Sequence, residues 1–231
     1  MPVGEKKVGL PELFYDLVFV YALSRITELV HHADKADYAM FLIALVILFT
    51  VWLYQSVYIN RFGDNSWRDR LFLFADMFLL LFLSNAVGSD WLANFVPFNL
   101  ALGLLVGSVC LQYLLQLARH ASPEQRRRIK LVAGLRGLTA ATVLGSLLFP
   151  ANIGQWVALG GFGLGWIFPA FVRHKQPAVN FPHLLERLNG LVIIFFGETV
   201  IDIAPYFHVA KFEMAAGQQQ MQPILPSRER V

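Results

Sequence analysis

Seven apolar stretches, each long enough to cross a membrane as a helix, divide this sequence of 231 residues. A helix needs roughly 20 residues to cross the hydrocarbon core of a bilayer. The links between the stretches are short and hold turn residues, as in 63–66 and at Gly88 and Pro150. Short links make consecutive helices antiparallel neighbours, so the sequence predicts an all-α polytopic transmembrane bundle. The expected spans are residues 10–30, 38–58, 71–87, 91–117, 129–149, 153–172 and 184–209.

Composition supports membrane insertion. Hydrophobic residues make up 56% of the chain and charged residues 15%, whereas soluble domains hold about 25% charged residues. The single cysteine, Cys110, excludes a disulfide within one chain. The segment after Lys6 and Lys7 is too long and too acidic for a signal peptide, so we expect it to be a retained first span. We expect one transmembrane domain over residues 1–210 and a polar tail over 211–231.

Lysine and arginine residues alternate between the two sides of this predicted bundle. The positive-inside rule places the basic side, with the N-terminus, in the cytoplasm, and predicts a multi-pass protein of the bacterial inner (plasma) membrane. Topology explains the basic run 126–128, so the pI near 9.1 does not indicate nucleic-acid binding. The basic side holds Lys6, Lys7, Arg61, Arg68, Arg70, Arg119, Arg126, Arg127, Arg128, Lys130, Arg173 and Lys175, and the links on the other side hold only Lys35.

Two pairs of acids lie inside predicted spans: Glu12 with Asp16, and Glu198 with Asp202. Residues four apart share one face of a helix. Ionisable groups at membrane depth are costly, and they mark transport pathways or buried partners. Glu12 has a second interpretation as a favourable acid at a helix start. For Asp16 a buried ion pair and a transport role both stay open.

Buried acids need counter-charges, and we considered the basic residues by depth. For Asp16 the candidates are Arg136, Arg25, a tyrosine hydroxyl or a bound cation. Asp76, which lies among phenylalanines, should also have Arg136 nearby. Arg25 would pair with Glu28 or Asp202.

Other motifs have simpler explanations. His31 and His32, with Asp34 and Asp37, could bind zinc, but a hydrated loop is favoured because the ligand spacing is irregular. The glycines of 160–165 favour close helix packing over phosphate binding. Aromatic residues near the span ends are expected at the membrane interface. We find no nucleophile elbow, H-E-x-x-H, P-loop or CxxC motif, so we expect no enzyme, no cofactor and no metal. The interfacial set is Trp52, Tyr54, Tyr58, Trp67, Trp91 and Trp156.

Two motifs carry a family resemblance. The first is ELFYDLVFVYAL at residues 12–23, and the second is Glu186-Arg187 followed by Gly197-Glu198. They resemble, in the same order, the opening and later segments of the bacterial low temperature requirement A (LtrA) family. Glu186 and Arg187 join Glu12, Asp16, Asp76, Arg136, Glu198 and Asp202 as candidate transport or buried-charge residues. The resemblance implies a role in growth in the cold but no molecular activity. Family members are longer, so we expect a C-terminally truncated member whose seventh span would begin an incomplete second repeat.

These features favour transport of a small ion, proton or solute through the membrane. In that hypothesis Asp16 and Glu198 alternate between charged and neutral states, Glu12 and Asp202 tune them, and Arg136 supplies a counter-charge. The alternative is a non-transporting structural or regulatory protein of cold or stress adaptation, whose buried charges only fix the helix register. A polar cavity at the acids would favour transport, and fully paired, dry charges would favour the alternative. The expected partners are the lipid bilayer and a proton or small ion, without nucleic acid, and homo-oligomer formation is left open.

Overall fold

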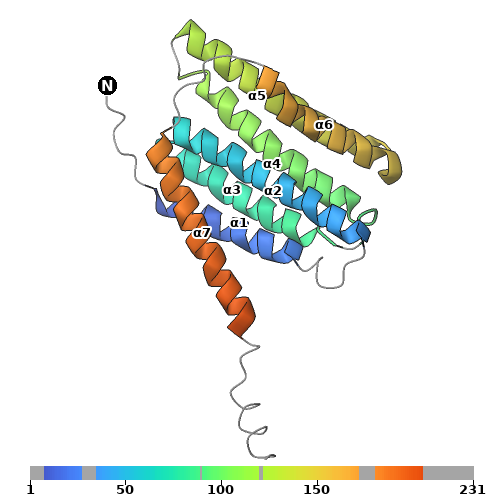
Figure 1. Cartoon of the computed structure of the whole chain (residues 1–231). Coiled ribbons are helices and arrows are strands. Elements are labelled where there is room, and N and C mark those ends of the chain that lie inside the picture. The colour runs from blue at the N-terminus through green and yellow to red at the C-terminus, as the bar shows by residue number, and fades with distance from the viewer. Residues whose placement is uncertain (1–7, 28–34, 89, 120–121, 172–179, 205–231) are drawn as a thin grey trace, which may run out of the picture. The chain divides into compact units, whose positions relative to one another are not determined.

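The computed structural model describes residues 8–27, 35–88, 90–119, 122–171 and 180–204, and these ranges are helical with short links and no strand (Figure 1). The all-α prediction is therefore confirmed. The α-helices are α1 Leu10–Thr27, α2 Lys35–Phe62, α3 Trp67–Asn85, α4 Phe95–Gln116, α5 Pro123–Gly145, α6 Ala151–Phe171 and α7 Phe181–Ile203, and the short 3-10 helix η2 covers Ser146–Leu148.

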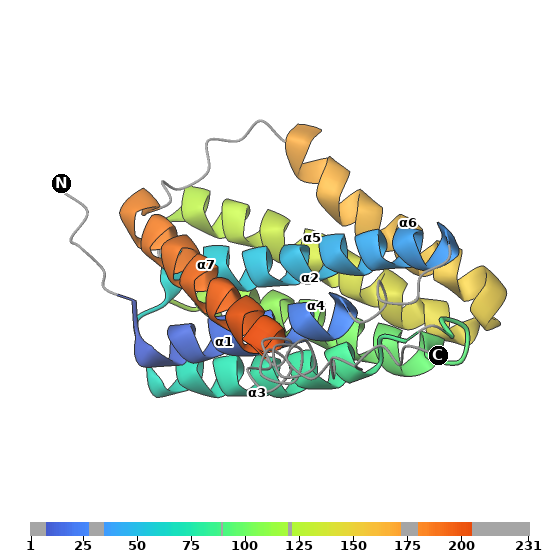
Figure 2. The same ribbon diagram turned by 60° about the horizontal axis from the view of Figure 1, so that its bottom comes forward.

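The chain divides into two compact units, Met1–Ile194 and Phe195–Val231, so the boundary falls inside α7. Within the first unit, neighbouring helices run in the order α6, α5, α4, α3 and α1, with α2 against both α1 and α4 (Figures 1 and 2). The predicted boundary between residues 210 and 211 lies outside the described residues.

Three of the described helical segments are apolar and long enough to cross a membrane: Tyr38–Phe62, Phe95–Gln116 and Pro123–Leu148. The shorter α1 carries Glu12, Asp16 and Arg25 within 18 residues, which lowers its apolar character. The count of seven spans, and the cytoplasmic placement of the N-terminus, stay predictions.

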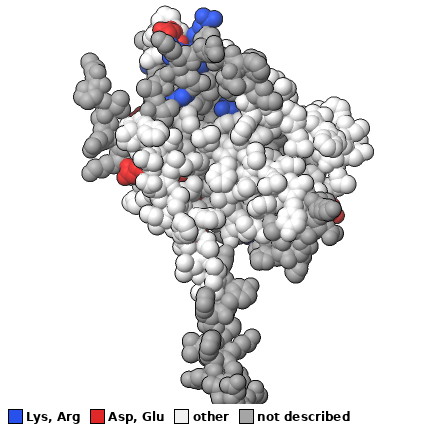
Figure 3. All heavy atoms as spheres, in the orientation of Figure 1, with Lys and Arg blue, Asp and Glu red and all other residues white. Residues whose placement is uncertain are grey.

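The described surface is apolar, as lipid contact requires. Trp67, Phe78, Trp156 and Ile193 are each at least 70% exposed. The face in Figure 3 shows few charged atoms, and its Lys and Arg atoms gather toward one end. The interior, by contrast, holds charged and amide side chains among its apolar residues. Apolar side chains facing out and polar ones facing in are typical of a helix bundle in lipid.

The link between α2 and α3 folds into a tight turn that joins the basic end of the bundle. Asn65 adopts a left-handed backbone conformation with φ of 58°, and Ser66 caps α3 by accepting a hydrogen bond from the Asp69 N–H. Arg119, just after α4, pairs with Asp64 at 2.8 Å. The predicted basic links after α2 and after α4 therefore meet at one end.

Two helices differ from the predicted spans for local reasons. α5 begins at Pro123, six residues before the predicted span start at 129, because Pro fits the first turn and the polar turn 126–128 continues the helix beyond the apolar region. α7 begins at Phe181, where the Asn180 carbonyl accepts from the Leu184 N–H and the Asn180 side chain accepts from the His183 N–H. The α7 start is thus capped by an asparagine that hydropathy alone does not mark.

Close packing between α5 and α6 confirms part of the glycine prediction. A Cβ on Gly161 or Gly165 would collide with the side chain of Thr142 or Thr139, whereas Gly160 and Gly163 have open space. The glycines that face α5 therefore let the two helices approach, and the others do not.

Candidate functional site

Four ionisable side chains from α1 and α7 meet inside the first unit, near the end where both helices begin. Glu12 and Asp16 lie four residues apart on α1, and His183 and Arg187 have the same spacing on α7. Each pair occupies one face of its helix, so the acidic face of α1 meets the basic face of α7. All four side chains are buried, with at most 2% of each exposed. We call Glu12, Asp16, His183 and Arg187 the charge cluster.

Asp16 and Arg187 form the centre of the charge cluster. Arg187 donates from Nη2 to Asp16 Oδ1 at 2.6 Å and from Nε to Asp16 Oδ2 at 3.2 Å. Trp52 on α2 donates its Nε1–H to Asp16 Oδ1 at 2.7 Å. Both carboxylate oxygens are therefore bonded, and the two-point geometry is the strong form of an arginine–carboxylate pair.

Glu12 occupies the outer side of the charge cluster, one turn from Asp16. Its Oε2 lies 3.3 Å from His183 Nε2 and 3.8 Å from Arg187 Nη1. Glu12 is in the first turn of α1, as its interpretation as a helix-start acid requires. Only 2% of its side chain is exposed, and it faces two basic side chains. The helix start therefore does not by itself account for this acid.

Asn60 on α2 fixes the orientation of the His183 ring. The Asn60 Oδ1 accepts from the Asn180 N–H at 2.9 Å, which assigns the amide orientation, and its Nδ2 donates to the Asn180 carbonyl at 2.9 Å. The same Nδ2 lies 3.2 Å from His183 Nδ1. Nδ2 can only donate, so this contact is a hydrogen bond when the ring is neutral and carries its proton on Nε2, facing Glu12.

A second group of buried polar side chains surrounds Asp76 on α3. Gln112 on α4 donates from Nε2 to Asp76 Oδ2 at 3.2 Å. Gln112 also exchanges hydrogen bonds with Gln55 on α2, at 3.1 and 3.2 Å, and contacts Ser108 Oγ at 3.3 Å. Asp76, Gln55 and Gln112 are each 1% exposed. We call Asp76, Gln55, Ser108 and Gln112 the amide cluster.

The expected pairing of Arg136 with Asp76 or Asp16 is wrong. The Arg136 guanidinium lies over the ring of Tyr54, with its Cζ 3.2 Å from the ring centroid, in a cation–π contact. Depth along the bundle placed Arg136 near the acids, but its helix, α5, packs against α4 and α6 and not against α1 or α3. The acids therefore find other partners.

The comparison with known families follows this geometry. The family model of the bacterial low temperature requirement A protein (LtrA) matches residues 7–219, a range that includes both clusters. The chain belongs to the LtrA family. An uncharacterized protein of Rhizobium meliloti is 25% identical over 224 residues, which cover 87% of this chain and 52% of that protein. The chain thus spans about half the length of this relative. No solved structure matches the chain.

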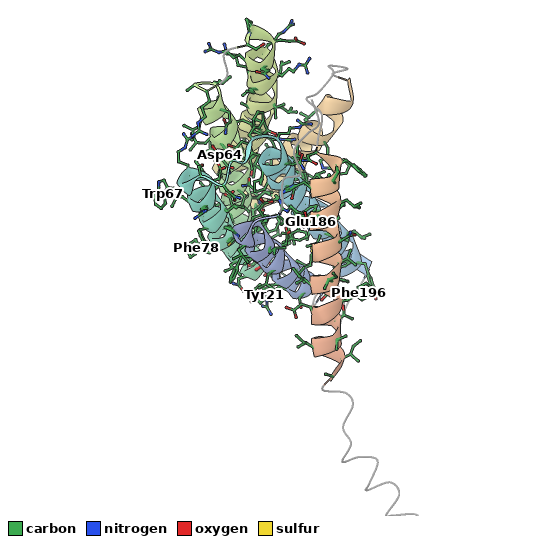
Figure 4. The ribbon with its side chains drawn as sticks, turned by 90° about the vertical axis from the view of Figure 1, so that its left-hand side faces the viewer. Tyr21, Asp64, Trp67, Phe78, Glu186 and Phe196 are labelled. Carbon is green, nitrogen blue, oxygen red and sulfur yellow. The ribbon has the colours of Figure 1, made fainter. Side chains whose placement is uncertain are left out.

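Several residues predicted from the sequence as site candidates lie outside the charge cluster. Glu186 is exposed on α7 (Figure 4), next to Arg187 but on another face. Glu198 is half-buried and belongs to the second unit. The side chain of Asp202 lies outside the described residues, as do Glu28, His31, His32, Asp34 and the side chain of Asp37.

The structure adds three residues to the candidate site that sequence analysis did not assign to it. Trp52 was expected at the membrane interface but is buried and bonded to Asp16. His183 and Asn60 were not considered. The spacing of His183 and Arg187, which repeats that of Glu12 and Asp16, was the one available signal. Within the described residues no group of three or more His, Cys, Asp and Glu is arranged for a metal ion.

Proposed function

We propose that this LtrA chain is a proton- or cation-coupled membrane transport protein in which Glu12 is the exchanging carboxylate. The observation that carries the proposal is the charge inventory of the charge cluster. It holds two carboxylates, one guanidinium and one imidazole in a buried site.

The charges of Asp16 and Arg187 cancel within one hydrogen-bonded pair. Glu12 shares the Arg187 guanidinium with Asp16, since Arg187 Nη1 is 3.8 Å away, and it also faces His183 Nε2 at 3.3 Å. With a neutral His183 ring, two carboxylates around one guanidinium carry a net negative charge, which is expensive at this degree of burial. In this proposal a proton or a small cation balances that charge at Glu12, and the occupant changes with conditions. Asp16 becomes the fixed partner in this scheme, whereas the sequence-based hypothesis gave it the exchanging role.

The contact between Asn60 and His183 links occupancy to helix contact. If His183 takes a second proton on Nδ1, its ring can no longer accept from Asn60. The ring would then pair electrostatically with Glu12 and lose its contact with Asn60, while the two hydrogen bonds between Asn60 and Asn180 would remain. Proton binding would thus remove one of the contacts between α7 and α2, which supports coupling between proton binding and helix rearrangement.

The position of the charge cluster supports access from one side. It lies at the beginnings of α1 and α7, toward the same end as the Asp64–Arg119 pair. That end carries the basic links, which the positive-inside rule assigns to the cytoplasm of an inner membrane. We propose that exchange occurs with the cytoplasm. Glu198 keeps its proposed exchanging role and Asp202 its proposed tuning role in this scheme.

Ion flux in liposomes tests the proposal. Purified protein would be reconstituted with an internal pH indicator, and proton and alkali-cation fluxes measured under an imposed gradient. We expect Glu12→Gln to abolish flux at equal amounts of folded protein. The matched control is Glu186→Gln, which neutralises an exposed acid and should leave flux unchanged. Unchanged flux in Glu12→Gln would contradict the proposal.

One observation favours a second candidate, a non-transporting structural or regulatory membrane protein. Both oxygens of Asp16 are hydrogen-bonded and Arg187 is fully buried, so this pair is already formed inside the bundle. Such a pair can fix the register of α1 against α7 without any flux. Well-folded protein that carries no proton or cation flux in the same liposomes would favour this candidate.

A further inference from the structure

We propose that Asp76 is a second proton-binding site, which holds a proton in this conformation while Asp16 is ionised. The inference deepens the proposed transport function by adding a second exchanging acid. Its test reads the proton directly and does not need flux.

The two aspartates differ in their partners although both are buried. Asp16 receives two bonds from a guanidinium and one from an indole. Asp76 has only neutral hydrogen-bond partners, the Gln112 amide and the Ser108 hydroxyl, and within the described part of the chain its Oδ1 has no partner of good geometry. Among the described residues no salt bridge to Asp76 forms. An ionised carboxylate in such a place carries the free-energy cost of desolvation without a compensating charge, and binding a proton removes that cost.

The amide cluster limits how well Gln112 can support a charge. The Nε2 of Gln112 faces three acceptors, which are Gln55 Oε1, Asp76 Oδ2 and Ser108 Oγ. Nε2 has only two hydrogens. The bond to Asp76 is therefore shared and long, at 3.2 Å. An ionised carboxylate prefers shorter, charge-assisted bonds.

The side chains near Asp76 come from α4, α2 and α1. From α4 the neighbours are Gln112 and Ser108, and from α2 Gln55 reaches it through Gln112; none of these side chains is charged. From α1 the neighbour is Tyr15, which is fully buried with an unbonded hydroxyl and interacts electrostatically with Asp76, Arg187 and Asp16. The charges of both clusters therefore act on Tyr15.

Infrared difference spectroscopy tests this proposal. A neutral carboxylic acid has a C=O stretching band that a carboxylate lacks, and the band shifts in heavy water. We expect a band component at neutral pH that persists in Asp16→Asn and in Glu12→Gln and disappears in Asp76→Asn. The matched control is Asp64→Asn, at an exposed acid, which should keep the band. Absence of a band in folded wild-type protein at neutral pH, or a band unchanged in Asp76→Asn, would overturn the proposal.

A second variant covers a folding failure of Asp76→Asn. Gln112→Leu removes the donor to Asp76 Oδ2, so the band should move to higher frequency, and a band that does not move would overturn the proposal. Bound sodium or potassium is the competing occupant. It predicts no neutral-acid band and a thermal stability that rises with that cation. Liposomes without flux but with the Asp76 band would reject the transport function alone, whereas flux without the band would reject this inference alone.

Discussion

The Nδ2 of Asn60 and the Nδ1 of His183 lie 3.2 Å apart, and an amide donor at this position favours a ring whose proton is on Nε2. Asn60→Asp would replace the donor with an acceptor. We expect His183 to become doubly protonated near neutral pH, because both ring nitrogens would then face carboxylates. Nitrogen NMR of histidine-labelled protein would show this as two protonated ring nitrogens. Asn99→Asp, a buried position on α4 whose amide bonds only its own helix, is the control, and a neutral His183 in Asn60→Asp would contradict the assignment.

Trp52 tests the bond to Asp16 without removing the aromatic packing. Trp52→Phe keeps a ring beside Phe19 but loses the Nε1–H. We expect a loss of about 1–3 kcal/mol in unfolding free energy, because a charged buried oxygen loses a donor. Trp166→Phe is the matched control, since Trp166 donates to the neutral Thr50 hydroxyl and is 55% exposed. Denaturant unfolding in detergent would measure both. Equal losses of unfolding free energy would contradict a special contribution from the hydrogen bond between Trp52 and Asp16.

Arg187 tests the ion pair itself. Arg187→Gln leaves two buried acids without their guanidinium, and we expect a loss of roughly 3–5 kcal/mol. Combining it with Asp16→Asn should recover part of the loss, because no unpaired charge then remains at that position. A double-mutant cycle of unfolding free energies would measure the coupling. Additive losses would contradict a direct Asp16–Arg187 bond.

Gly161 tests the close approach of α5 and α6. Gly161→Ala would place a methyl group against Thr142, and we expect a loss of about 1–3 kcal/mol from overpacking. Gly163→Ala is the control, because Gly163 has open space. Alanine there should leave stability unchanged or raise it by up to about 1 kcal/mol through helix propensity. Equal effects of the two substitutions would rule out a packing role specific to Gly161.

Asp64 gives a pH dependence at the basic end, outside the membrane spans. Hydrogen bonds from Ser66, with a further one from Arg119, hold the pKa of Asp64 well below its usual value. A lowered folded pKa means that the ionised carboxylate stabilises the fold at pH values above about 3.9, its unfolded pKa. That contribution disappears as the pH falls through the folded pKa. Thermal unfolding in acid should therefore show a smaller decrease in Asp64→Asn than in wild type, and identical pH profiles would contradict this.

Sequence analysis predicted the helices far better than their contacts. The apolar runs around α2, α4 and α5 are long, so length and composition were sufficient. The pairing of Asp16 with Arg187 joins residues 171 apart in sequence. It depends on how α1 and α7 are rotated about their axes, which hydropathy does not report. Depth in the membrane suggested Arg136 as the partner of the buried acids. Every helix of a bundle has residues at that depth, so depth does not identify which helices are neighbours.

The individual polar positions show the same limit. Trp52 was assigned to the membrane interface by residue type, although it is 3% exposed. Tryptophan prefers the membrane interface when many proteins are averaged. In this chain the Asp16 carboxylate accepts a hydrogen bond from Trp52, which is buried. Gly161 and Gly163 belong to one glycine run and have different surroundings, because only one of them faces α5.

The buried polar side chains also bear on how the bundle responds to cooling. Lipid chains are as apolar as leucine, so helices in a bilayer associate through packing and hydrogen bonds and not through the exclusion of water. Stabilisation by water exclusion weakens as temperature falls. The reciprocal amide bonds of Gln55 and Gln112 do not depend on it. We expect contacts of this kind to keep the interior of the bundle ordered as the temperature falls and the surrounding lipid stiffens.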